Sequence, residues 1–263
     1  MSIRKHIKYR SPAVTVTAHT SSHRFRLAAL LLAMLLCLTG CLSNRPSAYR
    51  KYVDALLAAN YKGDTKDYIK STGANVDDVD ATYLQNVSRL AENLITYYGL
   101  EISGNIDLAP EMTEVAKKIY SNVNYEVSDA YQDNTIYYVD VTVYPINILN
   151  QVNDQVVSYI DSFNTRVENG EFNDYVKEDY EAEFASGVID ILSSAADSIT
   201  YAEPETVKVR IIQTDDNFYI GNEDLRSVDL LMIADVEATD ETVDYINTDD
   251  DSYSDSSDGS SEN

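Results

Sequence analysis

The sequence contains no tryptophan, two cysteines and three histidines. The histidines are His6, His19 and His23, and they precede Cys37 and Cys41, so the chain beyond residue 41 has none of these residue types. Nucleophilic sites of the Ser-His-Asp and Cys-His kinds need an imidazole to accept a proton. Zinc sites of the common kind are built on His and Cys ligands. Both kinds of site, and any intramolecular disulfide, are therefore excluded beyond residue 41.

Glycine and basic residues are also scarce. The nine glycines are scattered and form no GxGxxG or GxxxxGK phosphate loop, so we expect no cofactor. No acidic residue precedes Asp54, whereas residues 42–263 carry all 44 acids with 14 basic residues, a formal net charge of −30. Such a surface repels nucleic acid and anionic lipid headgroups. We therefore expect no nucleic-acid partner and no electrostatic binding to a membrane.

The apolar run Leu27–Leu38 is too short to span a bilayer, which takes about 20 residues. It follows a basic segment with six Lys or Arg residues and precedes small residues, the order found in a secretory signal peptide. Leu38-Thr39-Gly40-Cys41 then resembles the bacterial lipobox. This resemblance implies cleavage between Gly40 and Cys41, and transfer of a diacylglyceryl group to the Cys41 thiolate.

The lipobox resemblance divides the chain. Residues 1–40 are predicted to be the signal peptide, and residues 41–46 the lipidated cysteine (with acyl chains such as palmitate) and a short linker. Two or more acyl chains on one residue anchor a protein stably, whereas one chain is marginal. We therefore expect a protein held by lipid at the extracytoplasmic face of the cell membrane.

Beyond residue 46, apolar residues recur at helical and at strand spacing. Helical spacing covers 79–95, 110–119 and 149–163, and strand alternation covers 137–143, which Pro145 ends, and 207–211. We expect the first strand to pair with 124–131. Gly63 and Gly170 follow amphipathic runs, where a left-handed helix end favours glycine. The sequence thus predicts an α+β fold with antiparallel strands.

Residues 51–70, KYVDALLAANYKGDTKDYIK, align without a gap with residues 158–177, SYIDSFNTRVENGEFNDYVK. A second similarity joins DNTIYYV at 133–139 and DNFYI at 216–220. These similarities indicate two tandem copies of a helix-helix-helix-β-hairpin unit, at 47–145 and 146–234.

The segment 235–263 contains eleven acids and no base, and it is predicted to be a disordered acidic tail. Ser254 and Ser256 occupy positions where an EF-hand loop before Gly259 needs acidic or amide oxygens, so no metal site is predicted.

Tyrosine is abundant, with 21 residues in the chain. Most of them have core spacing, but the adjacent pairs Tyr97-Tyr98 and Tyr137-Tyr138 must each place one ring on the less buried side. These pairs are the better candidates for contacts with a partner. Carboxylate pairs, the remaining catalytic option, could cleave glycosides if two of them lie about 5–10 Å apart.

The chain resembles the uncharacterised cell-surface lipoproteins of Firmicutes, which combine a lipobox with one or two α+β domains. Gly63–Lys70 and Gly170–Lys177 match the motif G-[DE]-x-x-D-Y-[VI]-K, and Val139–Pro145 matches the strand that ends at a Pro. The resemblance implies no mechanism. We expect a non-enzymatic module that binds an unknown protein or small molecule at the seam between the two repeats. The alternative is a carboxylate-dependent hydrolase, such as a glycoside hydrolase.

Overall fold

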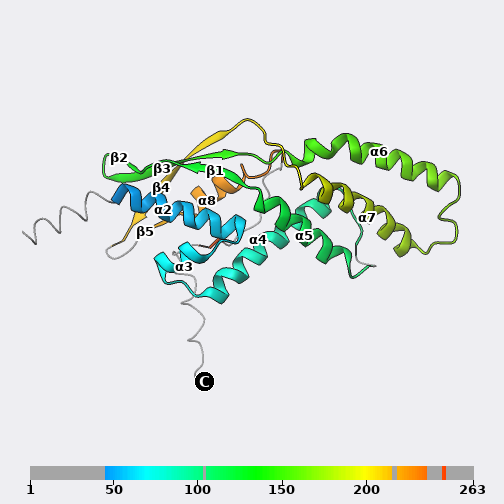
Figure 1. Cartoon of the computed structure of the whole chain (residues 1–263), viewed down its shortest axis with the longest axis horizontal. Coiled ribbons are helices and arrows are strands. Elements are labelled where there is room, and N and C mark those ends of the chain that lie inside the picture. Colours follow the sequence, from blue (N-terminus) through cyan, green and yellow to red (C-terminus); the bar gives the residue numbers. More distant parts are fainter. Residues whose placement is uncertain (1–44, 103–104, 215–217, 236–244, 247–263) are drawn as a thin grey trace, which may run out of the picture. The chain divides into compact units, whose positions relative to one another are not determined.

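Helices and strands occur where the spacing of apolar residues predicts them. The structure is a computed structural model that describes residues 45–102, 105–214, 218–235 and 245–246 (Figure 1). The helices are α2 Arg45–Leu57, the π-helix η1 Ala58–Lys62, α3 Lys66–Thr72, α4 Val76–Tyr97, α5 Leu108–Ser121, α6 Ile148–Glu168, α7 Lys177–Ala195 and α8 Asn222–Asp229. The strands are β1 Asn124–Val127, β2 Tyr131–Asp133, β3 Ile136–Tyr144, β4 Glu205–Gln213 and β5 Phe218–Ile220.

All strand pairs are antiparallel and belong to one sheet. The strand order is β1-β3-β4-β5, and β2 also pairs with β3. Val127 of β1 lies opposite Val141 of β3, so the predicted pairing of 124–131 with the 137–143 strand is confirmed. The α+β class with antiparallel strands is likewise confirmed.

Helices cover one face of this sheet (Figure 1). Val139 on β3 and Val209 on β4 are paired and buried on that face. The residues that alternate with them, such as Lys208 and Arg210, are exposed. This two-sided pattern explains the alternation of apolar and polar residues in the sequence, because successive strand side chains point to opposite faces.

The two predicted repeats contribute to the same sheet and the same hydrophobic core. Strand β3 lies in the first repeat and β4 in the second, and the two pair from Tyr137–Ile211 to Val143–Glu205. The aligned motifs also differ locally. Tyr68 lies in α3 and is 1 % exposed, whereas Tyr175 lies in the loop before α7 and is 45 % exposed. The tandem duplication therefore stays a prediction, and 47–145 and 146–234 do not have separate cores.

The glycines of the two motifs have the predicted left-handed conformation. Gly63 ends η1 with φ of 67°, and Gly170 follows α6 with φ of 79°. Glycine is favoured there because a Cβ atom strains this part of backbone space.

We expect Gly63→Ala to lower the free energy of unfolding by about 2–3 kcal/mol, since it adds backbone strain and a steric clash. A Cβ atom at Gly63 would lie 2.8 Å from Cζ of Tyr83. Gly73→Ala is the matched control, because Gly73 has φ of 73° but no atom within 4 Å of a built Cβ. It should cost only about 1 kcal/mol, for the strain alone. Equal losses in urea unfolding of the two variants would contradict the role assigned to Tyr83.

Two residues of the predicted tail, Tyr245 and Ile246, pack against the folded part of the chain. Ile246 is 4 % exposed and joins the main hydrophobic core, and Tyr245 packs against that core. The prediction of disorder is therefore wrong for these two residues, because an aromatic and an aliphatic side chain bury enough apolar surface to hold them. Residues 236–244 and 247–263 lie outside the described part of the chain.

Candidate functional site

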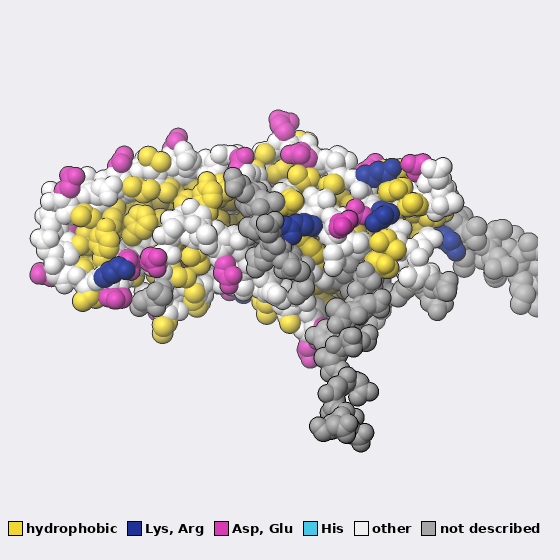
Figure 2. All heavy atoms as spheres, turned by 180° about the vertical axis from the view of Figure 1, so that it is seen from behind, with side chains coloured by type: hydrophobic (Ala, Val, Ile, Leu, Met, Phe, Trp, Pro, Cys, Tyr) yellow, Lys and Arg dark blue, Asp and Glu magenta, His cyan; other side chains and the backbone are white. Residues whose placement is uncertain are grey.

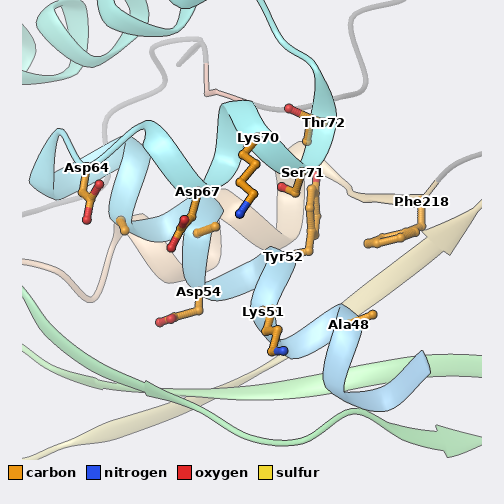
Figure 3. Close-up of a pocket in the computed structure, with 12 residues that line it drawn as sticks. Ala48, Lys51, Tyr52, Asp54, Asp64, Asp67, Lys70, Ser71, Thr72 and Phe218 are labelled. Carbon is orange, nitrogen blue, oxygen red and sulfur yellow. The ribbon is translucent and has the colours of Figure 1, made fainter. Parts of the chain in front are cut away.

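The candidate site is a groove between α2, the loop after η1, and α3, with one residue of β5 at its end. We call it the α2–α3 groove, and its volume is about 730 Å³ (Figure 3). The residues that line it are Ala48, Lys51, Tyr52, Asp54, Ala55, Ala58, Asp64, Asp67, Lys70, Ser71, Thr72 and Phe218.

The floor of the groove is apolar. The ring of Tyr52 meets the ring of Phe218 edge to face at 5.0 Å and lies 6.2 Å from the ring of Tyr68. Ala48, Ala55 and Ala58 recur along one side of α2 and η1. Their short side chains leave the hollow that longer side chains would fill.

Charged side chains line the walls of the groove. Asp64, Asp67 and Lys70 belong to the G-D-x-x-D-Y-I-K motif, and Lys51 and Asp54 project from α2 (Figure 3). In the described part of the chain, none of these five side chains forms an ion pair or accepts or donates a side-chain hydrogen bond. The motif thus places three unpaired charges beside an apolar floor, while its Tyr68 is buried beneath them.

Tyr125 borders this charged region from strand β1. Its hydroxyl donates a hydrogen bond to the main-chain carbonyl of Asp54 at 3.2 Å, and Lys62 lies 4.8 Å from its ring centre. Burial raises the pKa of Tyr125, and the charges of Asp54 and Asp64 raise that pKa further. The phenol therefore stays neutral and acts as a hydrogen-bond donor.

The acids of the groove do not form a site for a metal ion. Asp54, Asp64 and Asp67 are all exposed to solvent. Over the residues that the structure describes, no group of three or more His, Cys, Asp or Glu side chains could hold a metal ion. The chemistry available in the groove is thus ionic and hydrogen-bonded contact with a ligand, alongside apolar contact with the floor.

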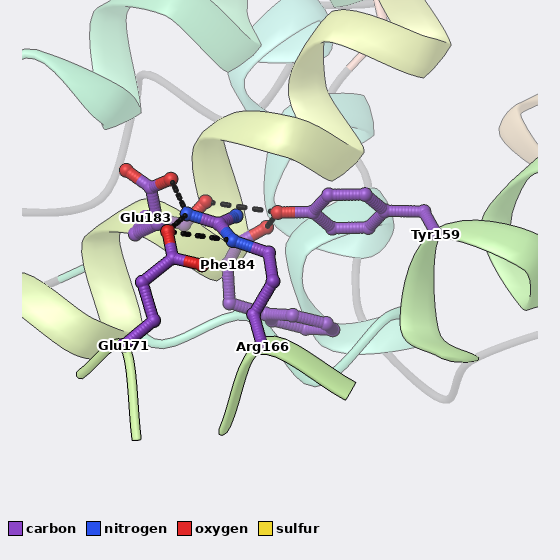
Figure 4. A network of polar contacts seen from close by, with 5 residues as sticks. All are labelled: Tyr159, Arg166, Glu171, Glu183 and Phe184. Carbon is purple, nitrogen blue, oxygen red and sulfur yellow. Dashed lines mark hydrogen bonds and ion pairs between the residues drawn. The ribbon is translucent and has the colours of Figure 1, made fainter. Parts of the chain in front are cut away.

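In the aligned segment of the second repeat, polar side chains contact other parts of the fold instead of lining a groove (Figure 4). Arg166 donates hydrogen bonds to Glu171 at 2.7 and 3.0 Å and to Glu183 at 2.9 Å. The hydrogen bond from Arg166 lowers the pKa of the Glu171 carboxyl. Tyr159 donates from its hydroxyl to the main-chain carbonyls of Glu183 and Phe184. These contacts tie α6 to α7 and engage the Glu171 carboxylate within the fold.

A second groove lies at the predicted seam, between α5 of the first repeat and α7 of the second. Its volume is about 1040 Å³, and it is more open to solvent than the α2–α3 groove. Its lysines already have partners within the fold: Lys117 pairs with Glu114, and Lys118 with Asp197. The seam therefore contains a groove, but fewer of its charges are available to a ligand.

The predicted tyrosine pairs lie outside the α2–α3 groove. Tyr97 at the end of α4 is 60 % exposed, and burial raises the pKa of its neighbour Tyr98 to about 12. Tyr137 packs against Tyr49 at 5.1 Å between ring centres, and Lys208 lies 3.9 Å from the ring centre of Tyr138. The first pair thus lies at the end of α4 and the second on β3, so the two pairs do not form one surface.

Hydrophobic side chains also reach the surface along α6 and in the loop before α7. Val157, Ile160, Val167, Tyr175 and Val176 are all exposed. Figure 2 shows one face of the molecule, where apolar side chains form broad areas bordered by acidic ones. Apart from the hydroxyl of Tyr175 these side chains are purely apolar, and no groove among the described residues is lined by them, so we assign no site to them.

The predicted lipidation residue Cys41 and the cleavage position after Gly40 lie outside the described residues. Among the helices that the structure describes, none is both long and apolar enough to cross a membrane. The sequence placed Asp64, Asp67 and Lys70 in a repeated motif but assigned no binding role to them, and it predicted the ligand site at the seam between the repeats. It gave no signal that Lys51, Asp54 and Phe218 line a common site, because the groove forms only when α2, α3 and β5 meet.

Comparison with known proteins identifies a similar fold. No protein-family model matches the chain, and no curated protein matches it in sequence. Among solved structures, the chain is similar to YcdA of Bacillus subtilis, a protein designated a lipoprotein. The match has a TM-score of 0.50 and 16 % sequence identity, and it covers 70 % of this chain. The match spans 55 % of the length of YcdA, and the likeness shows the fold alone.

Proposed function

We propose that the protein is a lipoprotein held at the extracytoplasmic face of the membrane by Cys41, and that its α2–α3 groove binds a ligand without converting it. The observation that carries the binding role is the set of five charged side chains around an apolar floor that have no ion-pair partner among the described residues. Both charge signs are present, through Lys51 and Lys70 and through three aspartates. The fitting ligand is therefore a small zwitterionic molecule or a short peptide with an apolar part.

Two observations support the lipoprotein part of the proposal. The N-terminal segment combines a basic region, a short apolar run and the sequence Leu38-Thr39-Gly40-Cys41. The fold is similar to that of a Bacillus subtilis protein that is itself designated a lipoprotein. Cys41 precedes the first residue of α2 by four positions, a span of at most about 14 Å in a fully extended chain. The anchor would thus hold the start of α2 close to the membrane.

A carboxylate-dependent hydrolase fits the groove less well. Such an enzyme needs two facing carboxyl groups, one of them kept protonated by apolar surroundings. Asp54, Asp64 and Asp67 are all exposed, so none is enclosed by apolar groups in the way that this acid requires. The geometry therefore favours binding over hydrolysis.

Photo-crosslinking on intact cells tests the binding role. A photoreactive residue replaces Ser71, which lines the groove and is exposed. We expect it to capture one ligand reproducibly, and Asp67→Asn combined with Lys70→Gln to reduce capture about tenfold or more, because each hydrogen bond to a charged group contributes about 1.5–3 kcal/mol.

The aligned second motif provides the matched control. Asp174→Asn occupies the position equivalent to Asp67, but it lies outside the groove, so it should leave capture unchanged. No reproducible product at Ser71, or equal losses in the Asp67 and Asp174 variants, would refute the groove as the binding site.

A further inference from the structure

Two buried asparagines connect the core to the C-terminal part of the chain. Asn60 of η1 is 1 % exposed and Asn86 of α4 is 2 % exposed. A buried amide must satisfy its polar atoms within the protein, because each one left without a partner costs about 1–3 kcal/mol. The hydrogen-bond partners of Asn60 therefore show which segment of the chain this buried side chain binds.

The side-chain amide of Asn60 makes four hydrogen bonds, which is its full capacity, and two of the four are with Ile246. Its Nδ2 donates to the main-chain carbonyl of Leu56 at 2.9 Å and to that of Ile246 at 3.1 Å. Its Oδ1 accepts from the main-chain N–H of Ile246 at 2.9 Å and from Nδ2 of Asn86 at 3.3 Å. The side chain thus pairs with both backbone groups of residue 246, as a neighbouring residue does in an antiparallel hydrogen-bonded pair.

The backbone of this region is itself unusual. Asn60 lies in the π-helix η1, and η1 ends at Gly63 in a left-handed conformation. Single π-turns are rare and occur frequently at functional sites. Here the π-turn presents a polar side chain to a segment that is 186 residues away in the sequence.

The side chains of Tyr245 and Ile246 are also contacted by the fold. The hydroxyl of Tyr245 donates to Oδ2 of Asp229 at 3.2 Å. Asp229 also accepts from Arg89 at 3.0 Å and from the hydroxyl of Tyr61 at 2.9 Å, so it is oriented independently of Tyr245. Ile246 is buried within the main core. The site therefore contacts a backbone, a phenol and an aliphatic side chain.

We propose that η1, α4 and α8 form a peptide-binding site for an extended segment with tyrosine followed by an aliphatic residue. In this chain, Tyr245–Ile246 occupy the site in cis. The backbone contacts through Asn60 do not depend on the identity of the side chains, so the same site accepts such a segment from a separate polypeptide once Tyr245 and Ile246 are displaced. This site is distinct from the α2–α3 groove.

The test uses the full chain with Tyr245→Ala and Ile246→Asp, which displaces the cis segment but leaves Asn60, Asn86 and Asp229 in place. The probe is a labelled hexapeptide with the sequence of residues 243–248, VDYINT. We expect saturable binding to the double variant. Binding to the wild-type chain should be at least tenfold weaker, because a tethered segment competes at an effective concentration in the millimolar range.

Two controls distinguish specific recognition of the peptide from non-specific binding. Asn60→Leu, added to the double variant, should abolish binding of the hexapeptide, and a hexapeptide with Asp in place of the Ile should not bind. Circular dichroism establishes that each variant is folded. Absence of binding to the folded double variant at about 1 mM peptide, or unchanged binding after Asn60→Leu, would overturn the proposal.

Discussion

Arg89→Met is expected to lower the free energy of unfolding by about 3–5 kcal/mol, because it leaves the carboxylate of Asp229 buried without its countercharge. The two side chains are 17 % and 12 % exposed and lie 3.0 Å apart. Burial by itself would lower the pKa of Arg89, but the charge of Asp229 and its hydrogen bonds outweigh burial and raise that pKa. The guanidinium therefore stays charged, and urea unfolding followed by circular dichroism measures the loss.

Arg50→Met is the matched control for this prediction. Arg50 pairs with Asp129 at 3.3 Å, but their side chains are 54 % and 72 % exposed. An exposed ion pair contributes between zero and about 1 kcal/mol, so this variant should unfold close to the wild type. Adding Asp229→Leu to Arg89→Met should recover part of the loss, since no lone buried charge then remains. A loss below about 1 kcal/mol for Arg89→Met would show that water reaches Asp229 and that the pair is not structural.

Cys41→Ala is expected to remove nearly all of the protein from the membrane fraction. The proposed lipid anchor is the only membrane attachment we infer, because the formal net charge of residues 42–263 is −30 and repels anionic headgroups. Without the thiolate no acyl chain can be transferred, so the protein should collect as unprocessed precursor or in the medium. Cell fractionation with labelled fatty acid measures both outcomes.

Cys37→Ala provides the control for the anchor, since Cys37 lies four residues before Cys41 within the predicted signal peptide. This variant should be processed, labelled and retained like the wild type. If Cys41→Ala kept its lipid label, or if the native protein carried intact residues 1–40, the lipoprotein assignment would be wrong. Such a result would not bear on ligand binding by the α2–α3 groove, which the crosslinking experiment tests independently.

Local periodicity was sufficient for much of the fold. Period-two alternation of valines located β3 and β4, because a strand that buries one face must alternate its side chains. Helical spacing located α4, α5 and α6, and the left-handed positions of Gly63 and Gly170 followed from the backbone freedom of glycine. These properties depend on neighbours within a few residues, which a sequence displays directly.

The pairing of segments far apart in the chain could not be derived in this way. The sequence predicted two repeats with a binding cleft at their seam, whereas β3 and β4 join both segments in one sheet. The α2–α3 groove needs Phe218 against Tyr52. Such contacts depend on which apolar surfaces meet in the collapsed chain, and many pairings satisfy the same local pattern.

The sequence by itself predicted the export signal and the lipobox cysteine, and it determined the absence of histidine and cysteine beyond residue 41 and the antiparallel α+β class. Only the tertiary structure decided that the charges of the first motif have no ion-pair partner in the described part of the chain, while in the second motif Glu171 pairs with Arg166 and Lys177 with Glu181. It also decided that Tyr245–Ile246 belong to the core. The reason is physical: composition and periodicity act locally, whereas burial and charge pairing depend on the distance between residues in space.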